Sequence, residues 1–509
     1  MARILLIKPP WNALQRIKYE EIHLGLCYIA SILRKANDEC LVFDGDFGYG
    51  DRTYDLKVAV ADYDHYLQSL RFDNPIWNKT RLILDQFRPD IVGISATTGS
   101  YGSAMKVAKI VKEHDSEIPV IMGGPHPTLL PEDTVKEPYF DIVVRGEGEY
   151  TMLEVVECLE KEKSLHEVKG ITFKDKGEIY HNPSRPLIEN LDSLPFPARD
   201  LIYEKEKYPH QAFGYILTSR GCPYECIFCS SPKIWGRKVR FRSPEKVVAE
   251  IEEVVRDFKT RTFRINDDTF TVNKKRVLEI CDLLIEKNLG ITWQCDTRVN
   301  LLTRDLCKRM KEAGCVQFNL GVESGNPEVL SFTKKGITLD QARNAIKMTK
   351  DAGILALAYF MIGFPDETCE QIQDTIAFME EVKPDFSVFS IVTPYPGTEL
   401  FDIARNMELL PRHLDWSTFF HHSPDMAFTK KISRERILAL IKEIDEIVEK
   451  QYAKVALSHP RQLLHWSRKR YQRNPLLILY DLRLVGSLVY DKVVSKDSRR
   501  YIKRTSRAK

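Results

Sequence analysis

Short apolar runs alternate with amphipathic stretches over the first 160 residues of the chain. The runs are rich in Val, Ile and Leu and nearly unbroken, as strands are when a sheet is buried on both faces. The amphipathic stretches between them, such as LGLCYIASILRKA, predict helices. The alternation indicates a doubly wound parallel sheet. Its strands are expected at 3–10, 39–46, 91–98, 119–127 and 141–147.

A second alternation of the same kind begins near residue 215. Six apolar runs are separated by helical stretches of about a dozen residues, a length typical of βα units. Six units form an open, partial (β/α)6 barrel, in which the chemistry occupies the carboxyl ends of the strands. The strands are expected at 214–220, 261–270, 291–299, 316–324, 355–365 and 386–396.

Pattern changes divide the chain into four parts. The first sheet accounts for residues 1–160 and the barrel for 215–410. Between them, 161–214 contains a hairpin pattern around a Lys-Gly turn and a proline-punctuated stretch, which predict a linker with a small β element. The last part, 411–509, is helical and ends in a basic tail. The predicted fold class is therefore α/β with a helical C-terminal region.

Composition favours a soluble, cytoplasmic protein. Of the 509 residues, 43% are hydrophobic and 29% are charged, as in ordinary globular proteins. No apolar run approaches the roughly 20 residues of a membrane-spanning helix. The N-terminus, MARILLIKPP, has neither the apolar core nor the cleavage site of a signal peptide.

The net charge of +3 hides a strongly basic tail. Residues 459–509 hold 14 Lys and Arg against three Asp, so the tail carries +11 and the rest of the chain −8. Trp, Tyr and Leu among these charges are typical of a helix lying on an anionic membrane surface. The pattern leaves two interpretations open, peripheral contact with the inner membrane surface and a solvated basic end. Nucleic acid is attracted by the same charge but is the less favoured partner.

Three of the eleven cysteines are clustered: Cys222, Cys226 and Cys229 have the spacing C-x3-C-x2-C. A structural zinc site needs four ligands, and no second pair follows at a suitable spacing. A [4Fe–4S] cluster is held by thiolates, and three of them leave one iron open to another molecule. The spacing therefore predicts a cluster whose fourth iron binds a ligand from outside the chain.

This motif, in the loop after the first barrel strand, resembles that of the radical S-adenosylmethionine (SAM) superfamily. The resemblance implies that SAM chelates the open iron. One electron from the cluster then cleaves SAM to methionine and a 5′-deoxyadenosyl radical. A one-electron donor such as flavodoxin or ferredoxin is implied as a partner.

The resemblance also implies which side chains contact SAM. Phe228, before the third cysteine, is expected near the adenine, above the turn 362–368. Asp267 or Asp268 stands where the family has an acidic patch that holds the SAM ammonium group. Three further strand-end residues are expected at the SAM carboxylate or ribose, namely Arg298, Glu323 and Ser324. For each of these residues, core packing or a structural salt bridge is the alternative.

The first sheet resembles the Rossmann-like cobalamin (B12)-binding fold. That family has a Ser-containing loop after the third strand and a Gly-Gly pair after the fourth. Here Ser95 and Thr97 stand before Gly123 and Gly124, and 25 residues separate Thr97 from Gly123. The glycines would allow the backbone to approach the nucleotide tail of cobalamin closely, and Ser95 or Thr97 would bond to it.

One departure concerns the lower ligand of cobalt. Enzymes that ligate cobalt through histidine carry D-x-H-x-x-G after the first strand, whereas this chain has EIHLGL at 21–26, with the glycine one residue early. We therefore expect cobalt to lack a histidine ligand. His23 and His126 are interpreted as packing or surface residues.

The combined resemblance implies an enzyme that methylates an unactivated carbon of a small-molecule or lipid-like substrate. An alternative is oxidation, as in the anaerobic magnesium-protoporphyrin monomethyl ester cyclases, which the chain also resembles. A cobalamin-binding sensor is an alternative of another class, disfavoured by the intact cysteine motif. A methylthiotransferase would need further clustered cysteines, and Cys27, Cys40 and Cys158 are dispersed.

Overall fold

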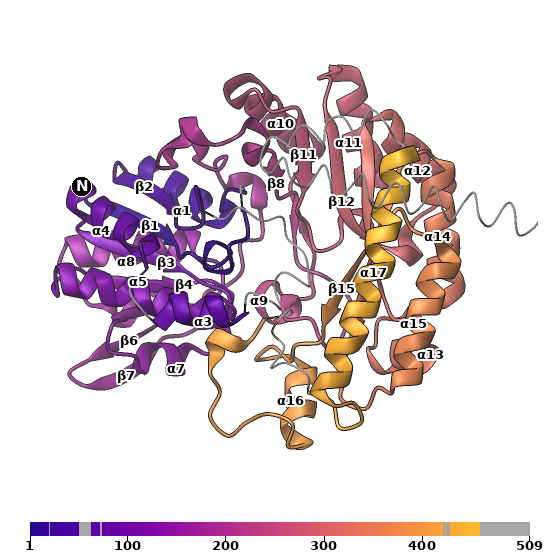
Figure 1. The fold of residues 1–509 in the computed structure, drawn as a ribbon. Coiled ribbons are helices and arrows are strands. Elements are labelled where there is room, and N and C mark those ends of the chain that lie inside the picture. The colour runs from indigo at the N-terminus through magenta and orange to yellow at the C-terminus, as the bar shows by residue number, and fades with distance from the viewer. Residues whose placement is uncertain (20, 50–62, 72–73, 421–422, 424–427, 459–509) are drawn as a thin grey trace, which may run out of the picture.

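The computed structural model describes residues 1–19, 21–49, 63–71, 74–420, 423 and 428–458 (Figure 1). The first sheet has seven strands in the order β2-β1-β3-β4-β5-β6-β7, and its first five strands are parallel. The doubly wound sheet is therefore confirmed. Its parallel strands are β1 (Arg3–Lys8), β2 (Glu39–Asp44), β3 (Ile91–Ser95), β4 (Val120–Gly123) and β5 (Ile142–Val144).

The apolar strands of this sheet serve two separate cores. Alternate residues of a strand point to opposite faces, so Ile4 and Leu6 of β1 pack in one core and Leu5 and Ile7 in the other. The first core includes residues of α1 (Leu24–Lys35) and α8 (Glu149–Glu160). The second includes residues of α4 (Ile76–Phe87) and α5 (Tyr101–His114). The described part of this unit also contains the helices α3 (Tyr63–Arg71), α6 (Pro125–Leu129) and α7 (Pro131–Lys136).

The predicted hairpin forms as β6 (Ile171–Asp175) and β7 (Glu178–His181). It does not stand alone, because β6 pairs antiparallel with β5. Part of the predicted linker thus extends the first sheet. Gly177, at the turn, has a φ of +87°, a conformation that favours glycine.

The second sheet contains six parallel strands in the order β15-β14-β13-β12-β11-β8 and is open between β15 and β8. The partial barrel is confirmed. Its strands are β8 (Tyr215–Ile216), β11 (Thr262–Ile265), β12 (Thr292–Arg298), β13 (Cys315–Glu323), β14 (Leu355–Ile362) and β15 (Phe386–Ile391). The helices around it are α10 (Pro244–Phe258), α11 (Lys274–Lys287), α12 (Arg304–Glu312), α13 (Pro327–Phe332), α14 (Leu339–Asp351) and α15 (Cys369–Val382).

The first barrel strand differs from its prediction. Instead of one strand over 214–220, β8 ends at Ile216, and β9 (Ser219–Arg220) pairs antiparallel with β10 (Arg240–Phe241). This break redirects the chain just before the cysteine motif.

Helix α16 (Glu399–Asn406) ends the barrel part of the chain, and the described part of the C-terminal region contains the long helix α17 (Arg434–Ser458), in agreement with the helical pattern of the sequence. Helix α17 runs beside β15, where the Tyr452 hydroxyl donates to the carbonyl of Ser387 at 3.1 Å. Between these helices the chain touches the first sheet unit, since the Tyr66 hydroxyl donates to the carbonyl of Ser417 at 2.9 Å. In the described part of the chain, no helix has the length and apolar character to cross a membrane. The predicted basic tail lies outside the described residues.

Candidate active site

The three clustered cysteines lie on the loop between β9 and the short helix α9 (Ser231–Trp235), next to the carboxyl end of the first barrel strand. All three thiols are free and half-buried. Burial raises the pKa of Cys222, and it raises the pKa of Cys229 to about 12. The amide N–H of Tyr224 donates to Cys222 and that of Ser231 to Cys229, and both oppose this rise. Such donors stabilise a thiolate, the form in which cysteine binds iron.

The three cysteines are compared here with the needs of a single metal ion and of a cluster. Within the described residues, no group of three or more His, Cys, Asp or Glu side chains is placed to hold one metal ion. A [4Fe–4S] cluster binds each cysteine to a different iron, so its ligands surround the cluster without converging on one point. Three thiols with N–H donors, on one loop at a barrel edge, therefore fit the cluster that the sequence predicts.

Arg298, at the end of β12, belongs to the same loop structure. Its guanidinium carbon lies 3.6 Å from the centre of the Tyr224 ring, and its Nη1 lies 3.5 Å from the Sγ of Cys226. Its Nη2 donates to the carbonyl of Lys335, and its buried Nε has no partner. Arg298 thus adds a positive charge beside the second cysteine, and it retains one free donor.

Glu323 ends β13 in an unusual backbone conformation. Its φ is +70°, in the left-handed region that non-glycine residues rarely occupy. Its carboxylate is buried and pairs with Lys335 at 2.6 Å. A Cβ on Gly321 would stand 2.4 Å from the Lys335 Nζ, so the glycine makes room for the pair. Strain of this kind concentrates at functional sites, and Lys335 was not predicted from the sequence.

The two candidate aspartates have different surroundings. Asp267 is buried and accepts hydrogen bonds from both the amide and hydroxyl groups of Thr218 and Ser219, at 2.5 to 3.1 Å. These bonds hold the segment between β8 and β9. Asp268 is exposed and accepts one bond, from the Ser231 hydroxyl at 2.5 Å.

Phe228 packs in a small apolar cluster with side chains from β14 and from the turn that follows it, Met361 and Phe364. The turn is fixed by Glu367, whose Oε2 accepts from the amides of Gly363 at 2.6 Å and Phe364 at 3.1 Å. Burial raises the pKa of Glu367 to about 7. The structure thus brings the predicted aromatic residue to the predicted turn.

Ser324 directly follows β13 and packs toward α15. It is fully buried, and its hydroxyl is 3.0 Å from that of Thr375 on α15 and accepts from the amide of Asn326. The structure does not bring Ser324 together with the cysteines.

The predicted cobalamin residues lie at the carboxyl edge of the first sheet. Ser95 ends β3 and pairs with Gly123 of β4. Gly124 has a φ of +103°, and a Cβ there would stand 2.7 Å from the carbonyl oxygen of Ala96. Thr97 begins the next turn, where its amide donates to the Ser100 hydroxyl at 3.0 Å. The Ser loop and the Gly-Gly pair are therefore in direct contact.

The two histidines are structural. The Nδ1 of His23 caps α1 by accepting from the Leu26 amide at 3.1 Å, and its Nε2 lies 3.4 Å from the Ser95 Oγ. Burial, assisted by Lys8, lowers the pKa of His23 to about 4. His126 is fully buried, and burial lowers its pKa to about 3. Both imidazoles are therefore neutral at pH 7.

A buried group of charges joins the two sheets beside the cysteines. Glu147, after β5, pairs with Arg220 at 2.6 Å and with Arg240 at 2.8 Å, and Glu149 pairs with Arg220 at 2.5 Å. All four side chains are at least 94% buried. Arg220 is two residues before Cys222, so these pairs, called here the interdomain clamp, fix the cysteine loop to the first sheet. Periodicity along the chain gives no sign of such a contact.

The carboxyl edges of the two sheets face each other. Helix α6, which follows Gly124, contacts α9, which follows the third cysteine. Leu129 of α6 also meets the loop after β15, since a Cβ on Gly397 would stand 2.8 Å from it. Figure 1 shows α9 between the first sheet and the barrel. Groups bound at the two edges would therefore lie opposite one another.

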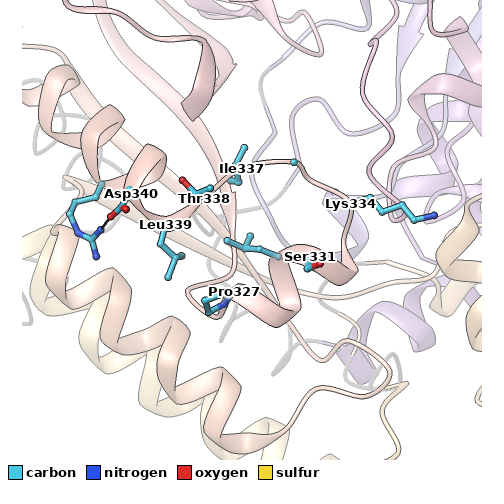
Figure 2. Close-up of a pocket in the computed structure, with 10 residues that line it drawn as sticks. Pro327, Ser331, Lys334, Ile337, Thr338, Leu339 and Asp340 are labelled. Atoms are coloured by element: carbon cyan, nitrogen blue, oxygen red, sulfur yellow. Dashed lines mark hydrogen bonds and ion pairs between the residues drawn. The ribbon is translucent and has the colours of Figure 1, made fainter.

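A separate surface pocket of about 670 Å³ lies where α13 leads into α14 (Figure 2). Its lining residues run from Pro327 to Arg343, and Asp340 pairs there with Arg343 at 2.5 Å. It includes none of the predicted cofactor residues, so it is not the site described above.

Comparison with known proteins agrees with this geometry. The family model described as the radical SAM superfamily matches residues 216–379, and that of the B12 binding domain matches 12–156. An uncharacterized methyltransferase of Pyrococcus horikoshii is 38% identical, over 87% of this chain and 91% of its own. The anaerobic magnesium-protoporphyrin IX monomethyl ester cyclase of Rubrivivax gelatinosus is 33% identical, over 64% of this chain and 60% of its own.

Among solved structures, the radical SAM methyltransferase TsrM from Kitasatospora setae, with cobalamin and a [4Fe–4S] cluster bound, is similar in fold. Its TM-score is 0.61 at 17% identity, with 80% of this chain and 75% of that chain covered.

Fold and site together define an enzyme of the radical SAM class, in which a cysteine-bearing partial barrel is joined to a doubly wound sheet. The chain belongs to the cobalamin-binding branch of the radical SAM superfamily. Its cofactors are a [4Fe–4S] cluster, SAM and cobalamin.

Proposed function

We propose that this protein transfers a methyl group to an unactivated carbon of a small-molecule substrate. When bound, the cluster and SAM supply a 5′-deoxyadenosyl radical that abstracts hydrogen, and the corrinoid supplies the methyl group. The observation that carries the proposal is the contact between α6 and α9, which sets the cobalamin edge opposite the cysteine loop.

In this proposal the chain itself holds and shields the cofactors. Cys222, Cys226 and Cys229 would bind the cluster, and the guanidinium of Arg298 would stabilise the negative charge at Cys226. Asp268 would accept the SAM ammonium group, since it is the exposed member of its pair and Asp267 is occupied. Phe228 would pack against the adenine.

Glu323 and Ser324 are proposed to act on SAM in different ways. Glu323 and Lys335 form a buried ion pair. Arg298 connects this pair to the cysteine loop, because it donates to the carbonyl of Lys335, and its Nε has no partner. This arrangement supports a role for Glu323 in orienting the ribose or carboxylate of SAM. Ser324 would act through the barrel wall, by holding the turn after β13.

On the cobalamin side, Ser95, Thr97, Gly123 and Gly124 would form the cradle of the nucleotide tail. The close approach of Gly124 to Ala96 supports this role, because any side chain at 124 would displace the Ser loop. Both ring nitrogens of His23 are engaged, one by capping α1 and the other beside the Ser95 hydroxyl, which favours cobalt without this histidine as a ligand.

We further propose that a flavodoxin or ferredoxin supplies the electron and that the basic tail contacts the inner membrane surface. The proposal for the tail is based on its sequence alone, and it would suit a lipid-like substrate. The four-part division at 160, 214 and 410 is proposed with one refinement, since β6 and β7 belong to the first sheet.

Oxidation of the cyclase type is the alternative activity, and the similarity to the cyclase relative supports it. Its products differ from those of methyl transfer. The test is an anaerobic assay of reconstituted enzyme with methyl-labelled SAM, dithionite and cobalamin, using a cell extract as the substrate pool. Methylation predicts 5′-deoxyadenosine, S-adenosylhomocysteine and label in an extract metabolite. Deoxyadenosine with a consumed substrate and no homocysteine product would instead establish oxidation.

A further inference from the structure

The inner face of the barrel is polar below the level of the cofactor residues. Strand register aligns Arg264 of β11 with Tyr215 and Gln294, and one level higher it aligns Asp296 with Asn319. The next level contains Arg298 and Gly321, where the cysteine loop docks. Arg264 is level with Gln294 of β12, which is four residues before Arg298 on the same strand. Arg264 is therefore about 13 Å deeper in the barrel than Arg298, measured along the strand direction.

Other side chains do not completely cover these polar side chains. The side chains of Arg264 and Asp296 are 27% and 24% exposed, although both belong to interior strands of the sheet. Strand residues on the opposite face, such as Phe263, Ile265 and Cys295, are almost completely buried under the helices. The exposure is therefore confined to the inner face of the barrel.

The guanidinium of Arg264 is only partly used. Its Nη2 contacts the carboxylate of Asp296 at 3.2 Å, and the guanidinium shares a hydrogen bond with the side chain of Tyr359. Its Nε is buried and has no hydrogen-bond partner, and Asp296 contacts its Nη2. The Nε and Nη1 edge of an arginine is the fork that binds two oxygens of a carboxylate or phosphate together.

The neighbouring carboxylates are committed to other donors. Asp296 accepts from the Asn319 amide at 2.7 Å, and Asn319 in turn accepts from Gln317 at 2.8 Å. Glu21, from the first sheet unit, accepts from the hydroxyls of Tyr19 and Tyr215. Each acid is thus held in place by other donors, and the Nε of Arg264 is left without an acceptor.

We propose that Arg264 binds an oxyanion of the methyl acceptor, a carboxylate or a phosphoryl group. This inference rests on the proposed function, since it names the class of substrate that the same site takes. A bidentate pair with a half-buried guanidinium satisfies the orphaned Nε and orients the substrate. The reacting carbon then lies toward the cysteine loop, on the far side of the substrate from its anionic group. A purely apolar lipid would leave this edge unsatisfied.

The first test follows binding with small probes. Acetate and methylphosphonate are added separately, at constant ionic strength, to reconstituted holoprotein, and the melting temperature is recorded. We expect one of the anions to raise the melting temperature of the wild type and of the control Arg261→Gln, an exposed arginine near the start of the same strand. Arg264→Gln should lose the shift, and Arg264→Lys should retain only part of it. Acetate as the active probe indicates a carboxylate, and methylphosphonate indicates a phosphoryl group. No shift with either anion, or an equal shift in Arg264→Gln, would overturn the inference.

The second test uses the labelled product of the extract assay. The labelled acceptor should be retained on an anion-exchange resin at neutral pH, and Arg264→Gln should raise its KM about tenfold or more. Formation of S-adenosylhomocysteine during cobalamin methylation alone should not change in this variant. A labelled but uncharged acceptor would refute the inference and leave the proposed function intact. Absence of both label and homocysteine product would instead refute the proposed function.

Discussion

Single residues account for much of the site, and the cysteines are the clearest case. Cys226→Ala removes one of three cluster ligands and the thiol beside Arg298. We expect formation of 5′-deoxyadenosine to fall below detection, because SAM is cleaved only on an intact cluster. Cys369→Ala is the matched control, since Cys369 is also half-buried but begins α15. Full SAM cleavage by Cys226→Ala would contradict the assignment.

Gly124 allows a similar test on the cobalamin side. Gly124→Ala places a Cβ 2.7 Å from the carbonyl of Ala96 and must move the Ser95 loop. We expect the cobalamin retained after gel filtration to drop about tenfold or more, with iron content unchanged. Gly177→Ala is the control, because Gly177 also has a positive φ but nothing lies within 4 Å of its added Cβ. Equal cobalamin retention by the two variants would argue against the proposed cradle.

The sequence indicated these residues unevenly. Spacing pointed to the cysteines, and resemblance to a family pattern pointed to the Ser and Gly-Gly loops, because in both cases the neighbours along the chain are part of the motif. It could not separate Asp267 from Asp268, since their difference arises from the break between β8 and β9, where Thr218 and Ser219 turn toward Asp267. The polar–apolar alternation in TFRIN (262–266), by contrast, indicates that Arg264 lies on the face of the strand opposite to Phe263 and Ile265.

At the scale of elements, the interdomain clamp is the contact that sequence patterns miss most completely. Its partners are 71 to 93 residues apart, and charged residues are rarely expected in a core. Glu147→Ala leaves the guanidinium groups of Arg220 and Arg240 without a shared counterion in a buried site. We expect unfolding to require about 3–5 kcal/mol less free energy, as measured by chemical denaturation.

The control for the clamp is Glu154→Ala, which removes a more exposed carboxylate from its pair with Arg185. Its effect should stay within about 1 kcal/mol. A loss of similar size in both variants would mean that the clamp adds nothing beyond an ordinary surface pair.

The turn between β14 and α15 should make stability depend on pH. Burial raises the pKa of Glu367 from 4.5 to about 7. Between these values the folded protein keeps a proton that the unfolded chain has lost, so stability falls as pH rises from about 4.5 to about 7. Glu367→Gln cannot ionise and still accepts from Gly363 and Phe364, so it should lack this decline.

The measurement is the difference in unfolding free energy between Glu367→Gln and the wild type, taken from pH 5 to pH 8. It should shift in favour of the variant by about 1.4 kcal/mol per pH unit at most. A pH-independent difference would show that Glu367 ionises normally in the folded protein.

At the scale of the whole molecule, strand and helix alternation correctly predicted the two sheets and their parallel order. Buried parallel strands produce apolar runs that are visible in one sequence. How the sheets meet could not be predicted, because α6 and α9 are short helices about 100 residues apart with no periodic pattern to relate them. The face-to-face arrangement of the two carboxyl edges is thus the main contribution of the structure.

That arrangement is the central claim, and pulsed electron paramagnetic resonance tests it most directly. Reduced holoprotein carries unpaired electrons on both the [4Fe–4S] cluster and cob(II)alamin, and dipolar coupling between them depends on their separation. The account predicts a resolved coupling, which should be absent from Cys226→Ala because it lacks the cluster. Holoprotein that contains both cofactors and shows no coupling would contradict the claim that they face each other.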